Sequence, residues 1–175
     1  MASRYTFVDY SPEWPRAFAR EAERVAKLLG GTVVTVHHIG STAVPGLAAK
    51  PIIDLLPVVR DIAEVAARVS AFEAAGYVAW GEYGLPGRRF FSKDRDGWRT
   101  HNVHVYAAGH PDIVRHLAFG AYLRAHPAVR DEYAAVKRAA FARHPDDVAA
   151  YNADKDAWIK RVERLAAEWA AIDAA

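Results

Sequence analysis

The sequence has no cysteine among its 175 residues, which excludes disulfide bonds and metal sites built on thiolate ligands. It has no apolar run near the roughly 18 residues of a membrane-spanning helix, and its start has no basic stretch followed by an apolar one. Lys and Arg number 23 against 21 Asp and Glu, and the formal net charge of +2 is too small to favour a nucleic-acid partner. We therefore expect a cytoplasmic protein, monomeric or weakly homo-oligomeric, that binds neither membrane nor nucleic acid.

Hydrophobic residues make up 52% of the chain, an ordinary share for a globular protein, and their pattern alternates between helix and strand periods. A mixed α/β fold is the expected class. Helices are expected at 12–29 and 61–75, strands at 32–39, 51–59, 77–83, 87–94 and 100–108, and helices from 111 onward with breaks near 125–129 and 143–147. We expect residues 1–110 to form an α/β domain and residues 111–175 a helical region packed on it as one compact unit.

The end of the first expected strand carries Gly40, Ser41 and Thr42 in succession. Such a turn offers backbone N–H groups and two hydroxyls, and glycine has no Cβ to obstruct a ligand. These are the features of a phosphate-binding turn. The alternative is a plain connection between a strand and the next helix.

A single aspartate, Asp54, interrupts the apolar strand 51–59. A carboxylate there must be paired, bound to metal or exposed in a cleft, because burying it alone costs several kcal/mol. Strand alternation places it on one face with Ile52 and Leu56. Asp54 is therefore the first candidate for contact with a ligand or metal, and the alternative is a carboxylate satisfied by backbone N–H groups or an arginine.

Later strands add four polar candidates. Asn102 and His104 share one face of the strand at 100–108 and could meet a substrate or a metal. Arg88 and Arg89 point to opposite faces of their strand, so at most one can reach the same cleft. A surface ion pair is the alternative for both arginines.

Lysines supply the remaining candidates. Lys137 follows Tyr133 by four residues, and Lys155 follows Tyr151 by four, so each pair lies on one face of its helix. A helical region that closes over a triphosphate would use these lysines, together with Lys50, to offset the phosphate charge. The alternative is that they are simply solvated.

Several segments together resemble the GrpB family, which is placed in the nucleotidyltransferase superfamily. They are "YSPEWPRAF", "HHIGSTAVPGLAAKPIIDLL", "GLPGRRFF", "THNVHVY", "HLAFGAYLRAHP" and "YAAVKRAAFARHPDDVAAYNADK". The resemblance implies a nucleotidyltransferase-like mixed sheet flanked by helices, with a C-terminal helical bundle. In that superfamily a Gly-Ser pair helps hold the nucleoside triphosphate, and an Asp-x-Asp or Asp-x-Glu strand binds magnesium. Gly40, Ser41 and Asp54 match these positions, whereas Leu56 stands where the second carboxylate belongs.

The resemblance implies that the protein binds a nucleoside triphosphate with Mg²⁺ and transfers a nucleotidyl group to an unidentified small acceptor. Asp54 would bind the metal and act in catalysis with His104, and Mg²⁺ would bind only together with the nucleotide. One alternative is a non-catalytic module for a nucleotide or a coenzyme-A-related ligand, since GrpB-like domains are fused to dephospho-coenzyme A kinases in some bacteria. A second alternative is a metal hydrolase built on His38, Asn102 and His104.

Overall fold

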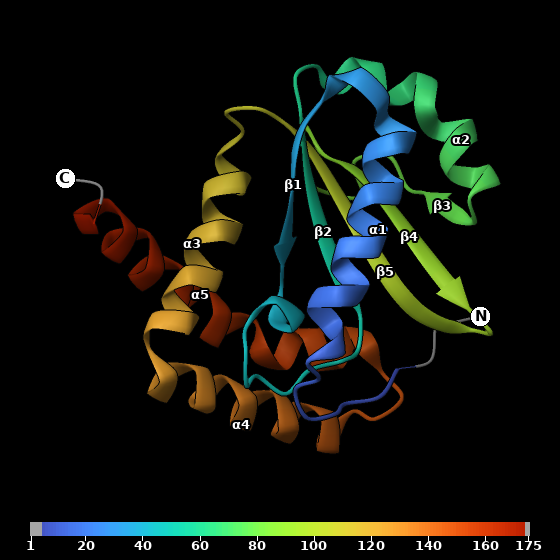
Figure 1. The fold of residues 1–175 in the computed structure, drawn as a ribbon. Helices are drawn as coiled ribbons and strands as arrows, with labels where there is room; N and C mark the ends of the chain where they lie inside the picture. Colours follow the sequence, from blue (N-terminus) through green and yellow to red (C-terminus); the bar gives the residue numbers. More distant parts are fainter. Residues whose placement is uncertain (1–4, 174–175) are drawn as a thin grey trace.

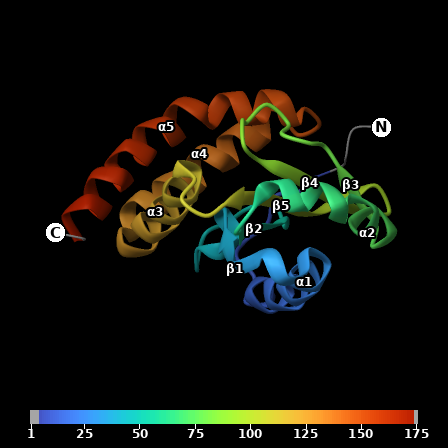
Figure 2. The same ribbon diagram turned by 90° about the horizontal axis from the view of Figure 1, so that it is seen from above.

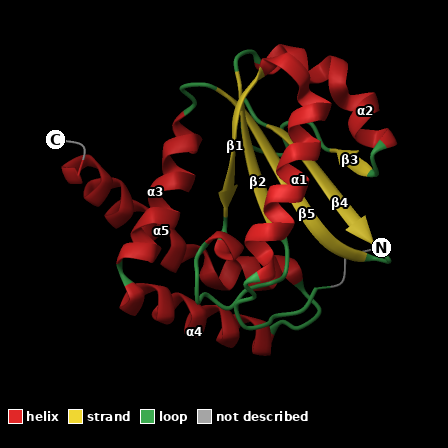
Figure 3. Cartoon of the chain, in the orientation of Figure 1, coloured by secondary structure: helices red, strands yellow, loops and turns green. Residues whose placement is uncertain are grey.

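The computed structural model describes residues 5–173, which form a five-stranded sheet with helices on both faces (Figures 1 and 3). The helices are α1 (Glu13–Leu29), α2 (Val69–Ala74), α3 (Pro111–Ala125), α4 (Pro127–Arg143) and α5 (Val148–Asp173), and the strands are β1 (Val33–Ile39), β2 (Ile53–Val59), β3 (Tyr77–Ala79), β4 (Arg89–Arg95) and β5 (Trp98–Ala107). Short 3₁₀ helices span Gly30–Thr32, Ser41–Ala43 and Ile62–Arg68. The expected mixed α/β class is confirmed.

The strands lie in the order β1-β2-β5-β4-β3, with β2 and β5 parallel and the other neighbours antiparallel. Helix α1 covers one face, and α3, α4 and α5 lie beyond the other (Figure 2). Leu55 and Val59 of β2 join the core beneath α1, whereas Leu56 and Val58 pack with Ile113 of α3. Apart from Asp54, strand β2 is apolar because helices cover both of its faces.

Two elements differ from the sequence prediction. Strand β3 ends at Ala79 instead of continuing to residue 83, because Gly81 and Tyr83 take φ values of +63° and +47° and turn the chain toward β4. The helix expected at 61–75 is a 3₁₀ helix over Ile62–Arg68, followed by α2. The three-residue spacing of its first apolar side chains suits three residues per turn.

The C-terminal helices begin and end close to the expected breaks. Pro111 and Pro127 occupy the first turns of α3 and α4, where proline lacks only an N–H that would have no helical partner. Helix α4 ends at Arg143, and α5 begins at Val148. Within residues 5–173, no helix combines the length and apolar character needed to span a membrane.

Candidate functional site

The turn after β1 lies directly against a carboxylate of β2. Gly40 has a φ of +72°, and a Cβ built on it would lie 2.6 Å from Asp54 Oδ2. Ser41 then begins the short 3₁₀ helix that leads away from the strand. A glycine is needed here for two reasons: the backbone conformation and the close approach of the aspartate.

Asp54 is held by side chains of the neighbouring strand. It stands opposite Asn102 in the parallel register of β2 and β5, and Asn102 Nδ2 donates to Asp54 Oδ1 over 2.9 Å. His104 Nε2 lies 3.5 Å from the same oxygen. Burial raises the pKa of Asp54, but the contacts with His104 and Asn102 and the charge of Lys50 outweigh burial and hold the pKa below its ordinary value. The group is therefore ionised at neutral pH, with 24% of its side chain exposed.

Asp54 lines a cavity of about 280 Å³ between the end of the sheet and helices α4 and α5. Eight of the sequence-predicted site residues line it: Gly40, Ser41, Thr42, Lys50, Asp54, Asn102, Lys137 and Lys155. Ala49, Ile52, Tyr133, Tyr151 and Asn152 complete its wall. The cavity thus joins the turn, one carboxylate, three lysines and two tyrosines.

Lys137 is buried, with 2% of its surface exposed, and its Nζ donates to Ser41 Oγ (2.9 Å) and to the backbone oxygen of Ala48 (2.6 Å). It also lies 4.4 Å from the ring centroid of Tyr133. Burial, with added repulsion from other lysines, lowers its pKa well below the ordinary value. Lys137 therefore connects α4 to the turn after β1.

Lys50 and Lys155 both lie over Tyr151, with Nζ to ring-centroid distances of 4.5 and 4.7 Å. Burial, followed by the charge of Lys50, lowers the pKa of Lys155 to about 8. Burial also lowers the pKa of Lys50, although Asp54 opposes this effect. The two ammonium groups repel each other beside one carboxylate, and an anionic ligand would relieve this repulsion.

The predicted arginines do not line this cavity. Arg88 Nη1 lies 3.3 Å from His104 Nδ1, and its other nitrogens donate to the backbone oxygens of Glu82 and Tyr83. A guanidinium only donates, so Nδ1 accepts and the His104 ring carries its proton on Nε2, toward Asp54. Arg89 lies 3.7 Å from Glu82, the surface ion pair that was the alternative. Arg88 thus acts on the site through His104.

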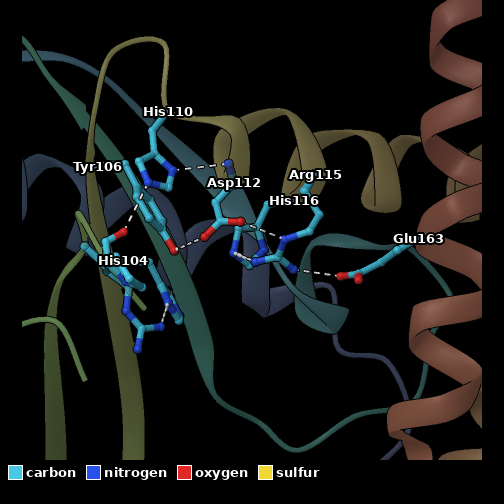
Figure 4. Close-up of polar contacts among 9 residues, drawn as sticks. His104, Tyr106, His110, Asp112, Arg115, His116 and Glu163 are labelled. Carbon is cyan, nitrogen blue, oxygen red and sulfur yellow. Dashed lines mark hydrogen bonds and ion pairs between the residues drawn. The ribbon is translucent and has the colours of Figure 1, made fainter. Parts of the chain in front are cut away.

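A further polar network joins the sheet to α3 and α5 (Figure 4). Tyr106 donates to Asp112 Oδ2 over 2.9 Å, and Arg115 donates to Asp112 Oδ1 over 3.0 Å and to Glu163 Oε1 over 2.7 Å. Burial, Arg115 and His104 lower the pKa of the neighbouring His116 to about 3. The network fixes α5, which carries Lys155 to the cavity, against the sheet.

The donors around the cavity do not fit a magnesium ion held by the protein. Asp54 is the one acidic side chain among the described residues that line the cavity. Leu56, at the next same-face position of β2, is fully buried in the core, and β5 presents Asn102 and His104 instead of an acid. No group of three or more His, Asp or Glu side chains within residues 5–173 is arranged to hold a metal. One carboxylate is too few oxygen ligands for Mg²⁺.

The histidines proposed for a metal hydrolase are not brought together. His38 stacks on Phe18 of α1, with ring centroids 4.5 Å apart, and its Nε2 lies 3.0 Å from Thr42 Oγ1. His104 faces the opposite side of the sheet, where its ring lies beside His116 of α3. Burial lowers the pKa of His38 to about 4. The alternative built on His38, Asn102 and His104 is therefore set aside.

Sequence reasoning missed one polar residue of the cavity wall. Asn152 lies three residues before Lys155 on α5, so helical spacing already places both on one face. Asn152 is exposed and belongs to no recognisable motif, so nothing else in the sequence pointed to it as a site residue.

Comparison with solved structures agrees with this architecture. The structure resembles that of Cid1 in complex with the UTP analog UMPNPP, with a TM-score of 0.53 over 78% of this chain and 43% of that chain. Sequence identity is 11%, so the likeness concerns the fold alone. The chain therefore has a nucleotidyltransferase-like fold.

The GrpB family pattern, described as "GrpB protein", matches residues 4–165, and the chain belongs to this family. The crystal structure of conserved protein GrpB from Enterococcus faecalis is 42% identical, with a TM-score of 0.88 over 92% of this chain and 96% of that chain. UPF0157 protein YqkA of Bacillus subtilis is 46% identical over 91% of this chain, which spans 46% of that protein. A dephospho-CoA kinase of Mycolicibacterium paratuberculosis is 33% identical over 91% of this chain and 45% of its own length. The chain thus spans less than half the length of these two relatives.

Proposed function

We propose that the cavity between the sheet and helices α4 and α5 binds the phosphate groups of a nucleoside triphosphate. The observation that carries the proposal is the convergence of Lys50, Lys137 and Lys155 on a cavity with a single carboxylate. A triphosphate brings about three or four negative charges, and fixed cations in a partly enclosed site offset such charges strongly. The Ser41 hydroxyl, already bonded to Lys137, lies where it can contact a phosphate oxygen.

Binding is favoured over the nucleotidyl transfer that the family resemblance implies. Two-metal transfer uses carboxylates to hold both ions, and the fully buried Leu56 replaces the second of them. Asp54, held ionised by Asn102 and His104, attracts the ammonium groups of Lys50 and Lys155. Any Mg²⁺ would arrive with the triphosphate, whose oxygens would supply most of its ligands.

A coenzyme-A-related ligand is the second candidate. The similarity to a dephospho-CoA kinase covers 91% of this chain but less than half of that kinase, so this type of domain occurs beside a kinase in one longer protein. Coenzyme A and its precursor also carry phosphates that three lysines could bind.

Titration calorimetry with ATP in EDTA tests the proposal, with coenzyme A and dephospho-coenzyme A as competitors. We expect Lys155→Ala to weaken ATP binding by about ten- to a hundredfold, the value of one charge-assisted contact. Lys160→Ala is the matched control, because Lys160 is an exposed lysine of the same helix paired with Asp156. Failure of the wild type to bind ATP would contradict the proposal. Pyrophosphate release that needs Mg²⁺ and that Asp54→Asn abolishes would instead support transfer.

A further inference from the structure

A second cavity, of about 310 Å³, lies next to the lysine cavity. Its wall contains the side chains of Tyr5, Pro51, Ile52 and Trp98, together with Arg99 and Thr100. Trp98 begins β5 and keeps 41% of its surface exposed. A partly exposed indole beside a proline and a tyrosine provides a flat apolar surface, and Arg99 is the one charged side chain among the described residues of this wall.

Two features connect the cavities. Ile52 lines both of them, on the segment that leads into β2. Arg99 of the second cavity donates to Asn102 Oδ1 over 3.1 Å, and Asn102 in turn donates to Asp54 in the first. The cavities therefore share Ile52 as a common wall, and the hydrogen bond between Arg99 and Asn102 joins a side chain of one cavity to a side chain of the other.

Lys50 also lies between the two cavities. Its Nζ lies 5.1 Å from the ring centroid of Tyr5, in the second cavity, and 4.5 Å from that of Tyr151, in the first. A ligand with a charged end and a flat apolar end would thus meet cations in one cavity and aromatic rings in the next. A nucleotide has this combination of groups.

We infer that the second cavity is a base-binding subsite, in which Tyr5 and Trp98 contact the base of the nucleotide whose phosphates occupy the lysine cavity. This inference rests on the proposed function and adds how the ligand is oriented. Stacking of a base on an aromatic side chain tolerates any base, because every base presents a π face. The subsite would therefore distinguish nucleotides from inorganic polyphosphates without selecting one base.

The test compares ATP with inorganic triphosphate, which has the charge but no base. We expect wild type to bind ATP more tightly than triphosphate. Trp98→Ala should weaken ATP binding by roughly five- to a hundredfold, the range for loss of one stacked base, and leave triphosphate binding within about twofold. Trp98→Phe, which keeps an aromatic ring, should restore most of the ATP affinity.

Trp80→Ala is the matched control. Trp80 is a similarly exposed tryptophan, 44% accessible, that lines neither cavity, so its removal should change neither affinity. Retained triphosphate binding by Trp98→Ala shows that this variant is folded.

The outcomes separate the two proposals. If triphosphate binds but ATP binds no more tightly, or if Trp98→Ala weakens both ligands equally, the base subsite is wrong while the phosphate site stands. If neither ligand binds to wild type, the phosphate site and the subsite that depends on it are both wrong.

Discussion

Raising the pH from 7 to 9 should weaken ATP binding through Lys155. The pKa of this lysine is about 8 in the free protein, below its ordinary value of 10.5, because it is buried beside Lys50. About nine in ten of these side chains are therefore charged at pH 7 and about one in ten at pH 9. Binding of an anion requires the charged form, so affinity is retained below pH 8 and falls as the pH rises through it, by about tenfold between pH 7 and 9.

Calorimetry at pH 7, 8 and 9 measures this dependence, and buffers of different ionisation enthalpy report the accompanying proton uptake. At pH 8 we expect uptake of about half a proton per ATP by Lys155. Lys155→Gln should bind ATP more weakly than wild type at pH 7 and lose the part of the pH dependence that Lys155 supplies, leaving the contributions of Lys50 and Lys137, whose pKa values are also lowered. Phosphate groups have a second pKa near 6 and change little over this range. Constant or rising affinity of the wild type between pH 7 and 9 would refute the role given to Lys155.

Three further substitutions test the framework of the site by urea denaturation. Gly40→Ala should destabilise the protein more than Gly97→Ala, although both glycines have positive φ. A Cβ at Gly40 would meet the carboxylate of Asp54, whereas a Cβ at Gly97 would meet nothing within 4 Å. Equal losses in the free energy of unfolding would contradict this expectation. Leu56→Asp should lower the free energy of unfolding by about 3 kcal/mol or more, because the position is fully buried, and should create no magnesium site. A stable variant that binds Mg²⁺ would overturn that expectation. Glu163→Gln should lower the free energy of unfolding by about 1 kcal/mol through its contact with Arg115, and no change would show that the network of Figure 4 does not anchor α5.

The sequence allowed much of the fold to be predicted, because its signals are local. The apolar run of β2, the prolines that begin α3 and α4, and the Gly-Ser turn after β1 each determine structure within a few residues. The region between 61 and 83 was less predictable. There, the three-residue spacing of apolar side chains gave a 3₁₀ helix, and the positive φ of Tyr83 kept the following strand short.

The site depends on contacts between residues far apart in the sequence. Helical spacing predicted that Lys137 and Lys155 each share a face with a tyrosine, and both tyrosines line the cavity with them. No local pattern shows that Arg88 contacts His104 instead of the cavity, since strand alternation gives only the face of the sheet. The second cavity was likewise beyond prediction, because it joins Tyr5 to Trp98 across most of the α/β region.

The most direct test of the phosphate site is a crystal structure of the protein grown with ATP and Mg²⁺. We expect the triphosphate among Lys50, Lys137 and Lys155, with any metal bound mainly by phosphate oxygens and by no protein carboxylate other than Asp54. A nucleotide bound elsewhere, or a metal held by two or more protein carboxylates, would contradict it.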